Sequence, residues 1–289
     1  MEIVDAQIHE PQPPRPVDER LGKEVGLLVN VEIAREAMDC VGVDAALVFA
    51  RQEYMDACVA RYPDRFAGAL TFDYLAPDLD EQVMRFRDRP NMLAGRNLLG
   101  NARDATLRPE FNEGKFERLY AAAEKHNLPL FISTHGHAEV MASVARAHPG
   151  LTLIIDHLGV SQSPVSPPRP EPWDRLPGLL SLAQFPNVHV KFSGAPVLSR
   201  EPYPHHDVWP YLHQVVEAFG PDRLMWGSDF TRLRWIPVVG GLAPRAQWHY
   251  YSDSVGYLRD TTELSPTDKE LIFSATIRRV LRWPKPQAT

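Results

Sequence analysis

The sequence predicts an α/β protein with a single (β/α)8 TIM barrel and C-terminal closing helices. Eight short apolar runs alternate with longer amphipathic stretches rich in Ala, Glu and Arg, the pattern of parallel strands joined by helices. No linker of shifted composition divides the 289 residues, so we treat residues 1–289 as one barrel domain. Two open α/β domains are the alternative. The sequence has neither a Gly-x-Gly-x-x-Gly turn nor a P-loop to support a doubly wound sheet.

Strands and helices are expected to alternate from the first residues onward. The strands are predicted at residues 2–9, 43–50, 66–72, 92–99, 128–135, 151–157, 187–194 and 223–229. The helices between them are predicted at residues 33–41, 54–62, 78–87, 115–126, 138–147, 176–184 and 206–219. Several helices run into Pro or Gly before the next strand, which ends them. Residues 250–283 predict two closing helices, with Ser265 as N-cap and Pro266 at the first helical position.

Three long connections follow predicted strands. They cover residues 10–30, 161–172 and 230–249, and the first two are rich in Pro. Each leaves the C-terminal end of a strand, and (β/α)8 enzymes build their active sites at that face of the barrel. We therefore expect these loops to surround a site.

Charge and composition exclude several classes of protein. The 31 Lys and Arg against 37 Asp and Glu give a net charge of −6, whereas nucleic-acid partners require a basic face. The apolar runs are shorter than a membrane-spanning helix needs, and the first residues lack the features of a signal peptide. We expect a cytoplasmic protein that binds neither nucleic acid nor membrane. With only Cys40 and Cys58 present, a metal must be held by His and carboxylates.

Residues that can bind a metal stand at the ends of four predicted strands. They are His9, His135, His157 and Asp229. Because the carboxyl ends of parallel strands meet at one end of a barrel, we expect these side chains to share one divalent metal. Imidazole and carboxylate ligands suit Zn and are compatible with Mn, Fe or Co.

Side-chain alternation assigns strand residues to the two faces of the sheet. In the first strand it places Asp5, Gln7 and His9 toward the barrel interior and the apolar residues between them toward the helices. It also predicts that Asp156 faces the helix layer and that Trp226 points outward.

Two cationic residues are candidates for binding a substrate anion. Arg96 lies late in the fourth strand, where its planar fork suits a carboxylate; the other interpretation is a salt bridge at the barrel rim. Lys191 should face inward and needs an anionic partner there. His189, deeper in the same strand, is expected to be a core residue with satisfied hydrogen bonds. His137, shortly after His135, is expected to contact substrate or cap the next helix.

The order of the strand-end motifs points to a family. Asp-x-Gln-x-His closes the first strand, His135 the fifth, Asp-His-Leu-Gly at 156–159 the sixth, and Trp-Gly-Ser-Asp at 226–229 the eighth. This order resembles the amidohydrolase superfamily over nearly the whole chain. It is most similar to the branch that contains aminocarboxymuconate semialdehyde decarboxylase, resorcylate-type decarboxylases and sugar or pyrone lactonases. The resemblance implies a (β/α)8 barrel with one metal, often Zn, and a homodimer.

Gln7 marks the position where the sequence departs from the family pattern, which usually carries a second His in this motif. A Gln carbonyl oxygen is a neutral and poorer ligand for Zn than imidazole. Gln7 is therefore expected to weaken metal binding or to hydrogen-bond the substrate. Some lactonases of this branch work without a metal.

Together these residues predict a hydrolase of a small carboxylated or cyclic substrate, a lactone before a cyclic amide. The metal would polarise the carbonyl and lower the pKa of its bound water towards about 7. Asp229, as in the family, would act as the general base, with His157 beside it. The alternatives are a non-oxidative decarboxylase of an aromatic or unsaturated acid, a metal-independent lactonase and a binding barrel without catalysis.

Overall fold

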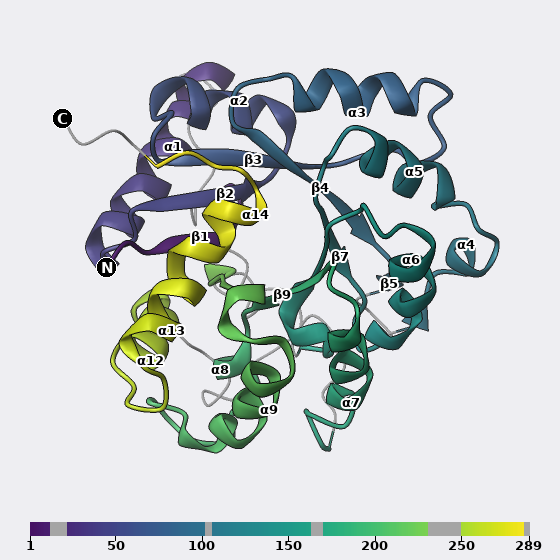
Figure 1. Cartoon of the computed structure of the whole chain (residues 1–289). Helices are drawn as coiled ribbons and strands as arrows, with labels where there is room; N and C mark the ends of the chain where they lie inside the picture. The colour runs from purple at the N-terminus through teal and green to yellow at the C-terminus, as the bar shows by residue number, and fades with distance from the viewer. Residues whose placement is uncertain (12–21, 102–105, 163–169, 231–249, 286–289) are drawn as a thin grey trace.

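Eight parallel strands form the centre of the computed structural model, which describes residues 1–11, 22–101, 106–162, 170–230 and 250–285 (Figure 1). The strands are β1 (Val4–Ile8), β2 (Ala45–Phe49), β3 (Phe66–Thr71), β4 (Met92–Leu98), β7 (Leu130–Ser133), β8 (Leu153–Ile155), β9 (Val188–Phe192) and β10 (Leu224–Trp226). Their order in the sheet is their order in the chain. All eight predicted strands are confirmed, each inside its predicted range. The predicted loops over residues 161–172 and 230–249 fall largely outside the described residues.

The sheet closes where the end of β10 meets β1. The backbone N–H of Asp229 donates to the carbonyl oxygen of Gln7 at 3.0 Å. The neighbouring N–H of Ser228 donates to the Asp5 carboxylate at 2.8 Å. These bonds join the last strand to the first, so the architecture is the predicted (β/α)8 barrel.

Helices surround the barrel between successive strands (Figure 1). They are α1 (Lys23–Val41), α2 (Gln52–Arg61), α3 (Leu79–Arg87), α4 (Pro109–Asn112), α5 (Glu117–Lys125), α6 (Met141–Ala147), α7 (Leu176–Leu180), α8 (Ala195–Leu198), α9 (Trp209–Phe219), α12 (Tyr251–Arg259), α13 (Pro266–Glu270) and α14 (Thr276–Val280). Short 3-10 turns η2 (Ala138–Val140), η3 (Asp156–Gly159) and η6 (Pro221–Arg223) precede or follow several of them, and a hairpin of β5 (Gly100–Asn101) and β6 (Thr106–Leu107) follows β4.

Helix α1 corrects the predicted loop over residues 10–30, because it begins at Lys23. Its first turns carry the apolar residues Val25, Leu28 and Val29 at helical spacing, although all three are exposed.

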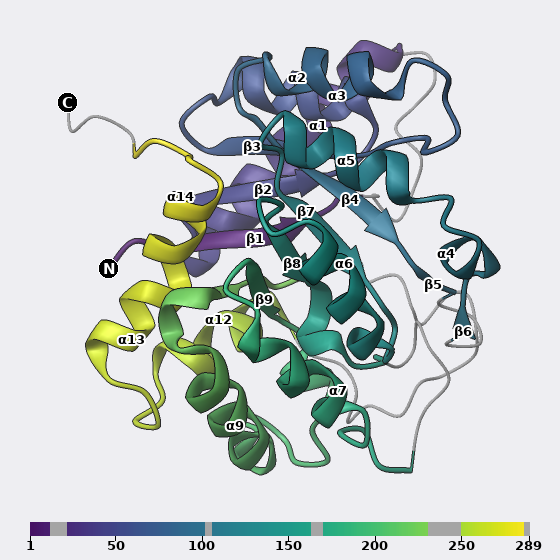
Figure 2. The same ribbon diagram turned by 45° about the vertical axis from the view of Figure 1, so that its right-hand side comes forward.

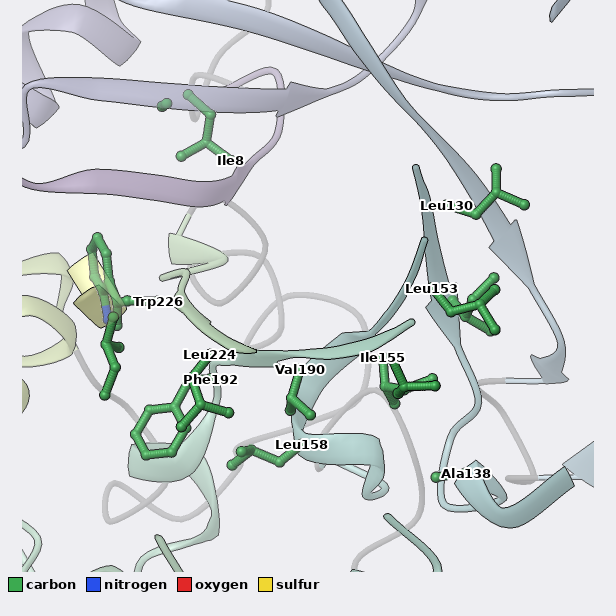
Figure 3. Close-up of a cluster of buried hydrophobic side chains, with 14 of the residues drawn as sticks. Ile8, Leu130, Ala138, Leu153, Ile155, Leu158, Val190, Phe192, Leu224 and Trp226 are labelled. Atoms are coloured by element: carbon green, nitrogen blue, oxygen red, sulfur yellow. The ribbon is translucent and has the colours of Figure 1, made fainter. Parts of the chain in front are cut away.

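Two apolar clusters occupy the two faces of the sheet. The outer cluster packs the strands against the helices and includes Ile8, Ile155, Val190 and Trp226 (Figure 3). The inner cluster fills the barrel with residues of the strands and of the chain after the π-helical turn Leu271–Ala275. Its members are Val4, Ala6, Ala45, Leu47, Phe49, Ala67, Ala69, Leu93, Ala94, Phe131, Ile154, Met225, Ile277, Leu281 and Trp283. Helix α14 and the residues after it therefore close the end of the barrel where the strands begin, on the opposite side of the molecule from β5 and β6 (Figure 2).

Strand β1 corrects the predicted assignment of its faces. Ala6 belongs to the inner cluster, whereas Asp5 lies beside α12 and binds a tyrosine hydroxyl there. The register with β2 shifts between Asp5 and Ile8, and such a bulge reverses the alternation beyond it. Gln7 therefore reaches the interior as predicted, where it contacts Lys191, but Asp5 does not.

The C-terminal segment confirms the predicted closing helices. Ser265 Oγ accepts from the backbone N–H of Asp268 at 3.1 Å, and the Asp268 side chain accepts from the Ser265 N–H at 3.3 Å. This is a capping box with Pro266 in the first turn. Trp226 points outward as predicted, and its indole N–H donates to the Ser254 carbonyl oxygen at 3.0 Å. None of the described helices is both long and apolar enough to cross a membrane.

His189 places a titratable group inside the barrel. Its side chain is buried, and Nδ1 has no hydrogen-bond partner among the described residues. The expectation of a fully satisfied core histidine is therefore wrong at this atom. Burial and the positive charges of Arg279 and Arg223 lower the pKa of His189 to about 4.

We expect His189 to destabilise the protein as the pH falls from 6.5 to about 4. In this interval the unfolded chain binds a proton at His189 and the folded chain does not. The free energy of unfolding should therefore fall by roughly 3 kcal/mol as the pH falls through it. Urea unfolding of the wild type and of His189→Gln between pH 4 and 7 measures it. The difference between the two free energies of unfolding should change by that amount across the interval, whereas a constant difference would contradict the assignment. Burial raises the pKa of Asp5 to about 6, so Asp5 stabilises the fold as the pH falls. This effect is the same in both proteins and cancels in the difference between their free energies of unfolding.

Candidate active site

Three of the four predicted metal-binding residues lie together where the strands end. His9 follows β1, His157 lies in the turn η3 after β8, and Asp229 follows β10. His9 Nε2 is 3.0 Å from Asp229 Oδ1, and His157 Nε2 is 3.7 Å from Asp229 Oδ2. Asp229 and His157 are buried, whereas the His9 side chain is 25% exposed. The trio therefore reaches solvent through His9.

His135 contacts Ser133 and Ser161, and His137 lies near Glu139. His135 Nε2 lies 3.1 Å from Ser133 Oγ, and the His135 carbonyl oxygen accepts from Ser161 Oγ at 2.6 Å. His137 precedes η2, with its Nδ1 3.8 Å from Glu139 Oε1. The predicted ligand role of His135 and the predicted substrate contact of His137 stay predictions.

A left-handed backbone occurs at three of the predicted ligands. The angle φ is 48° at His135, 53° at His157 and 54° at Asp229. This conformation costs an ordinary residue about 1–2 kcal/mol. Such strained residues cluster at active sites, where surrounding contacts hold them. The backbone strain thus marks the same strand ends that the sequence motifs mark.

Asp156 corrects the prediction that it faces the helix layer. Its Oδ1 is 2.7 Å from Lys191 Nζ, and its Oδ2 is 3.1 Å from Arg96 Nη2, all within the barrel. Ile154 belongs to the inner cluster, so alternation along β8 turns Asp156 inward as well. The next residue, His157, has a left-handed backbone, so strict alternation does not continue past Asp156. Although burial raises it, the charges of Lys191 and Arg96 hold the pKa of Asp156 well below its usual range.

Lys191 links Asp156 to Gln7 and so determines which way the Gln7 amide points. The fully buried ammonium also donates to Gln7 Oε1. An ammonium only donates, so the amide atom facing it must be the oxygen, and the NH2 group faces the other way. Gln7 Nε2 lies 2.9 Å from Asp229 Oδ1 and 2.9 Å from His9 Nε2. Gln7 therefore presents a donor to the trio, where a metal ligand presents a lone pair.

Asp5 supports the backbone beside Asp229. Its carboxylate accepts from the N–H groups of Gln7 at 3.0 Å and Ser228 at 2.8 Å, from the Ser228 hydroxyl, and from the Tyr251 hydroxyl at 2.9 Å. Burial raises the pKa of Asp5 to about 6 against the effect of these donors. The sequence analysis gave neither Ser228 nor Tyr251 a role: Ser228 appeared only as a member of the Trp-Gly-Ser-Asp motif, and Tyr251 stands in none of the motifs.

Arg96 makes the salt bridge that was one of its two interpretations. Besides the pair with Asp156, its guanidinium carbon lies 5.0 Å from the centre of the Phe49 ring. Its buried Nε has no hydrogen-bond partner in the described part of the chain. One donor of this guanidinium is thus not used by the described residues.

The side chains as placed do not fit a bound metal. Among the described residues, no three or more His, Cys, Asp or Glu form a group that could hold one. Instead, His9 and Asp229 contact each other directly, and the Gln7 NH2 group points at both. The metal held by His9, His135, His157 and Asp229 stays a prediction, which elemental analysis of purified protein decides.

A family model described as Amidohydrolase matches residues 4–283, a range that includes every strand-end motif. The chain belongs to this amidohydrolase family. The resemblance inferred from the motifs is therefore confirmed.

Individual relatives extend the comparison. L-fucono-1,5-lactonase from Burkholderia ambifaria is 39% identical over 118 residues, which are 40% of this chain and 38% of that protein. A 4-sulfomuconolactone hydrolase from Rhizobium radiobacter is 36% identical over 80 residues, which are 27% of this chain and 24% of that protein. The chain thus matches well under half the length of these two relatives. A crystal structure of an amidohydrolase from Burkholderia multivorans with bound Zn shares the fold, with a TM-score of 0.73, 19% identity and coverage of 98% of this chain and 100% of that chain.

The ion pair between Lys191 and Asp156 should be strongly coupled. We expect Asp156→Asn to lower the free energy of unfolding by about 3–5 kcal/mol, because it removes the carboxylate that pairs with the buried Lys191 ammonium. Lys191→Met should cost less, since Asp156 keeps its pair with Arg96. The double variant should lose less than the sum of the two. Urea unfolding of the four proteins measures this, with Lys125→Met as control, since its exposed pair with Asp80 should contribute little to stability. Additive losses in the double variant would contradict the coupling.

Proposed function

We propose that the protein hydrolyses a lactone and that Asp229 removes a proton from the attacking water. The observation that carries this proposal is the placement of the Asp229 carboxylate. It lies at the end of the barrel where active sites form, with His9 and His157 on either side and the Gln7 NH2 group donating to it. Membership of the amidohydrolase family supports a hydrolase. Two relatives whose names denote lactone hydrolysis support the substrate class.

In the proposed reaction the Asp229 carboxylate acts on a water molecule. Gln7 donates to its Oδ1, His9 lies beside the same oxygen, and His157 Nε2 is 3.7 Å from its Oδ2. Water attacks the lactone carbonyl carbon while Asp229 accepts one proton from it. The new C–O bond forms, the ring C–O bond then breaks, and Asp229 returns the proton to the leaving oxygen. The product is a hydroxy acid.

Lys191 and Gln7 act as positioning residues in this proposal. Both side chains are fully buried, and the ammonium of Lys191 is already shared between Asp156 and the Gln7 oxygen. Lys191 thereby turns the Gln7 NH2 group toward Asp229. The sequence suggested that both residues contact substrate, and we infer instead that they act through the carboxylate they orient.

Arg96 supports a substrate that carries a carboxylate of its own. Asp156 faces two cations, Arg96 and Lys191, and the Arg96 Nε has no partner among the described residues. A guanidinium offers planar pairs of N–H groups that match a carboxylate. We therefore propose a carboxylated lactone in preference to a neutral sugar lactone.

Replacement of the proposed base should abolish turnover. We expect Asp229→Asn to lower kcat by roughly 10²–10⁴-fold, because an amide cannot accept the proton. The assay is acid release from a panel of carboxylated and neutral lactones, with circular dichroism to verify folding. Asp222→Asn is the matched control, since this exposed carboxylate lies just before the opposite end of β10. Full activity of Asp229→Asn, or release of CO2 without ring opening, would overturn the proposal.

The role of Arg96 predicts a change that depends on the substrate. We expect Arg96→Gln to raise KM for a carboxylated lactone by about tenfold or more, since the variant loses a charge-assisted pair of hydrogen bonds. KM for a neutral lactone should stay unchanged. Steady-state kinetics on one lactone of each kind measures the split. An equal rise for both substrates would indicate a structural role alone.

A further inference from the structure

A polar hollow lies at the end of the barrel opposite the candidate active site. It is lined by the residues that lead into β7 and β8, by the end of α3 and by the residues that follow α14. We call it the arginine hollow after Arg87 and Arg282, which lie in its wall with Asn127, Gly150 and Thr152. Helix α14 is at the entry side of the strands (Figure 2), so the hollow is separate from the trio at the strand ends.

Arg87 and Arg282 place two positive charges in the wall of the arginine hollow. Arg87 ends α3 and is partly buried, and Arg282 is exposed. Within the described part of the chain, neither side chain makes an ion pair or a hydrogen bond. The two are close enough that Arg282, after burial itself, lowers the pKa of Arg87. Like charges at this separation repel each other, so this part of the wall favours a negative charge between them.

The nearby carboxylates do not neutralise this pair. Asp88 follows Arg87 in the chain, and its effect on the pKa of Arg87 is smaller than the effects of burial and Arg282. Glu124 lies beside Gly150, but it accepts from the Gly150 N–H at 2.8 Å and contacts His148 Nδ1 at 2.8 Å. Its charge is therefore directed at the histidine.

We propose that the arginine hollow binds a phosphate-type oxyanion, either free phosphate or the phosphate group of a small ester. Guanidinium groups bind such oxyanions through paired N–H donors, and the polar side chains of Asn127 and Thr152 line the same hollow. An anion here removes the repulsion between Arg87 and Arg282. It also ties α3 to the segment that closes the barrel, so binding stabilises the fold. This site lies beyond the proposed hydrolase and does not depend on it.

Thermal unfolding of the full chain tests the proposal. At constant ionic strength set with chloride, inorganic phosphate should raise Tm by several degrees, since a ligand that binds only the folded state stabilises it. Arg87→Gln and Arg282→Gln should each weaken the apparent affinity for phosphate by about tenfold or more. In buffer without phosphate, both variants should unfold at or above the wild-type temperature, because the repulsion is gone.

Two controls separate the arginine hollow from general charge effects and from the active site. Arg85→Gln removes a positive charge from the same helix, but this exposed residue pairs with Glu81, so the response to phosphate should persist. It should also persist in Arg96→Gln, which alters the candidate active site. Glycerol phosphate as a second probe identifies the source: a larger rise than with inorganic phosphate supports an ester, and an equal rise supports free phosphate. No rise in the wild type, or a rise retained in Arg87→Gln and Arg282→Gln, overturns the proposal.

Discussion

The buried ammonium of Lys191 is the interaction on which the candidate active site depends. It neutralises Asp156 deep in the barrel, and the same group determines the orientation of the Gln7 amide. In this orientation, the Gln7 NH2 group faces Asp229 Oδ1 and His9 Nε2. Four strands that lie far apart in the sequence are thereby joined by one continuous polar chain. Without an anion on one side of Lys191 and an acceptor on the other, its charge would have no place in an apolar barrel.

Sequence periodicity was sufficient for the strands but not for every side chain at their ends. The eight strands, the capped closing helices and the outward Trp226 could be predicted, because they follow from local patterns that tertiary contacts reinforce. The faces of Asp5 and Asp156 could not. A register shift in β1 and a left-handed residue at His157 each break the alternation of period two on which the prediction depended. Neither irregularity is visible in the pattern of apolar and polar residues on which the prediction depended.

The role of Gln7 also could not be predicted from the sequence. The residue type alone indicates either a weak metal ligand or a substrate contact, because it does not say which way the amide points. In the structure, Lys191 donates to the Gln7 carbonyl oxygen, so the amide nitrogen faces Asp229 and His9. The sequence does indicate the ion pair between Lys191 and Asp156. Lys191 is a strand lysine that needs an anion, and Asp156 is an acid at the end of the strand that pairs with β9.

Helix α14 and the residues after it, which close the barrel where the strands begin, also constrain the order of folding. Ile277, Leu281 and Trp283 belong to the same inner cluster as Val4 and Ala6 of the first strand. The inner face of β1 therefore stays incompletely covered on the ribosome until residues near 283 have been synthesised. Contacts of such high sequence separation slow folding, and they make completion of the barrel a late event in which nearly the whole described chain takes part.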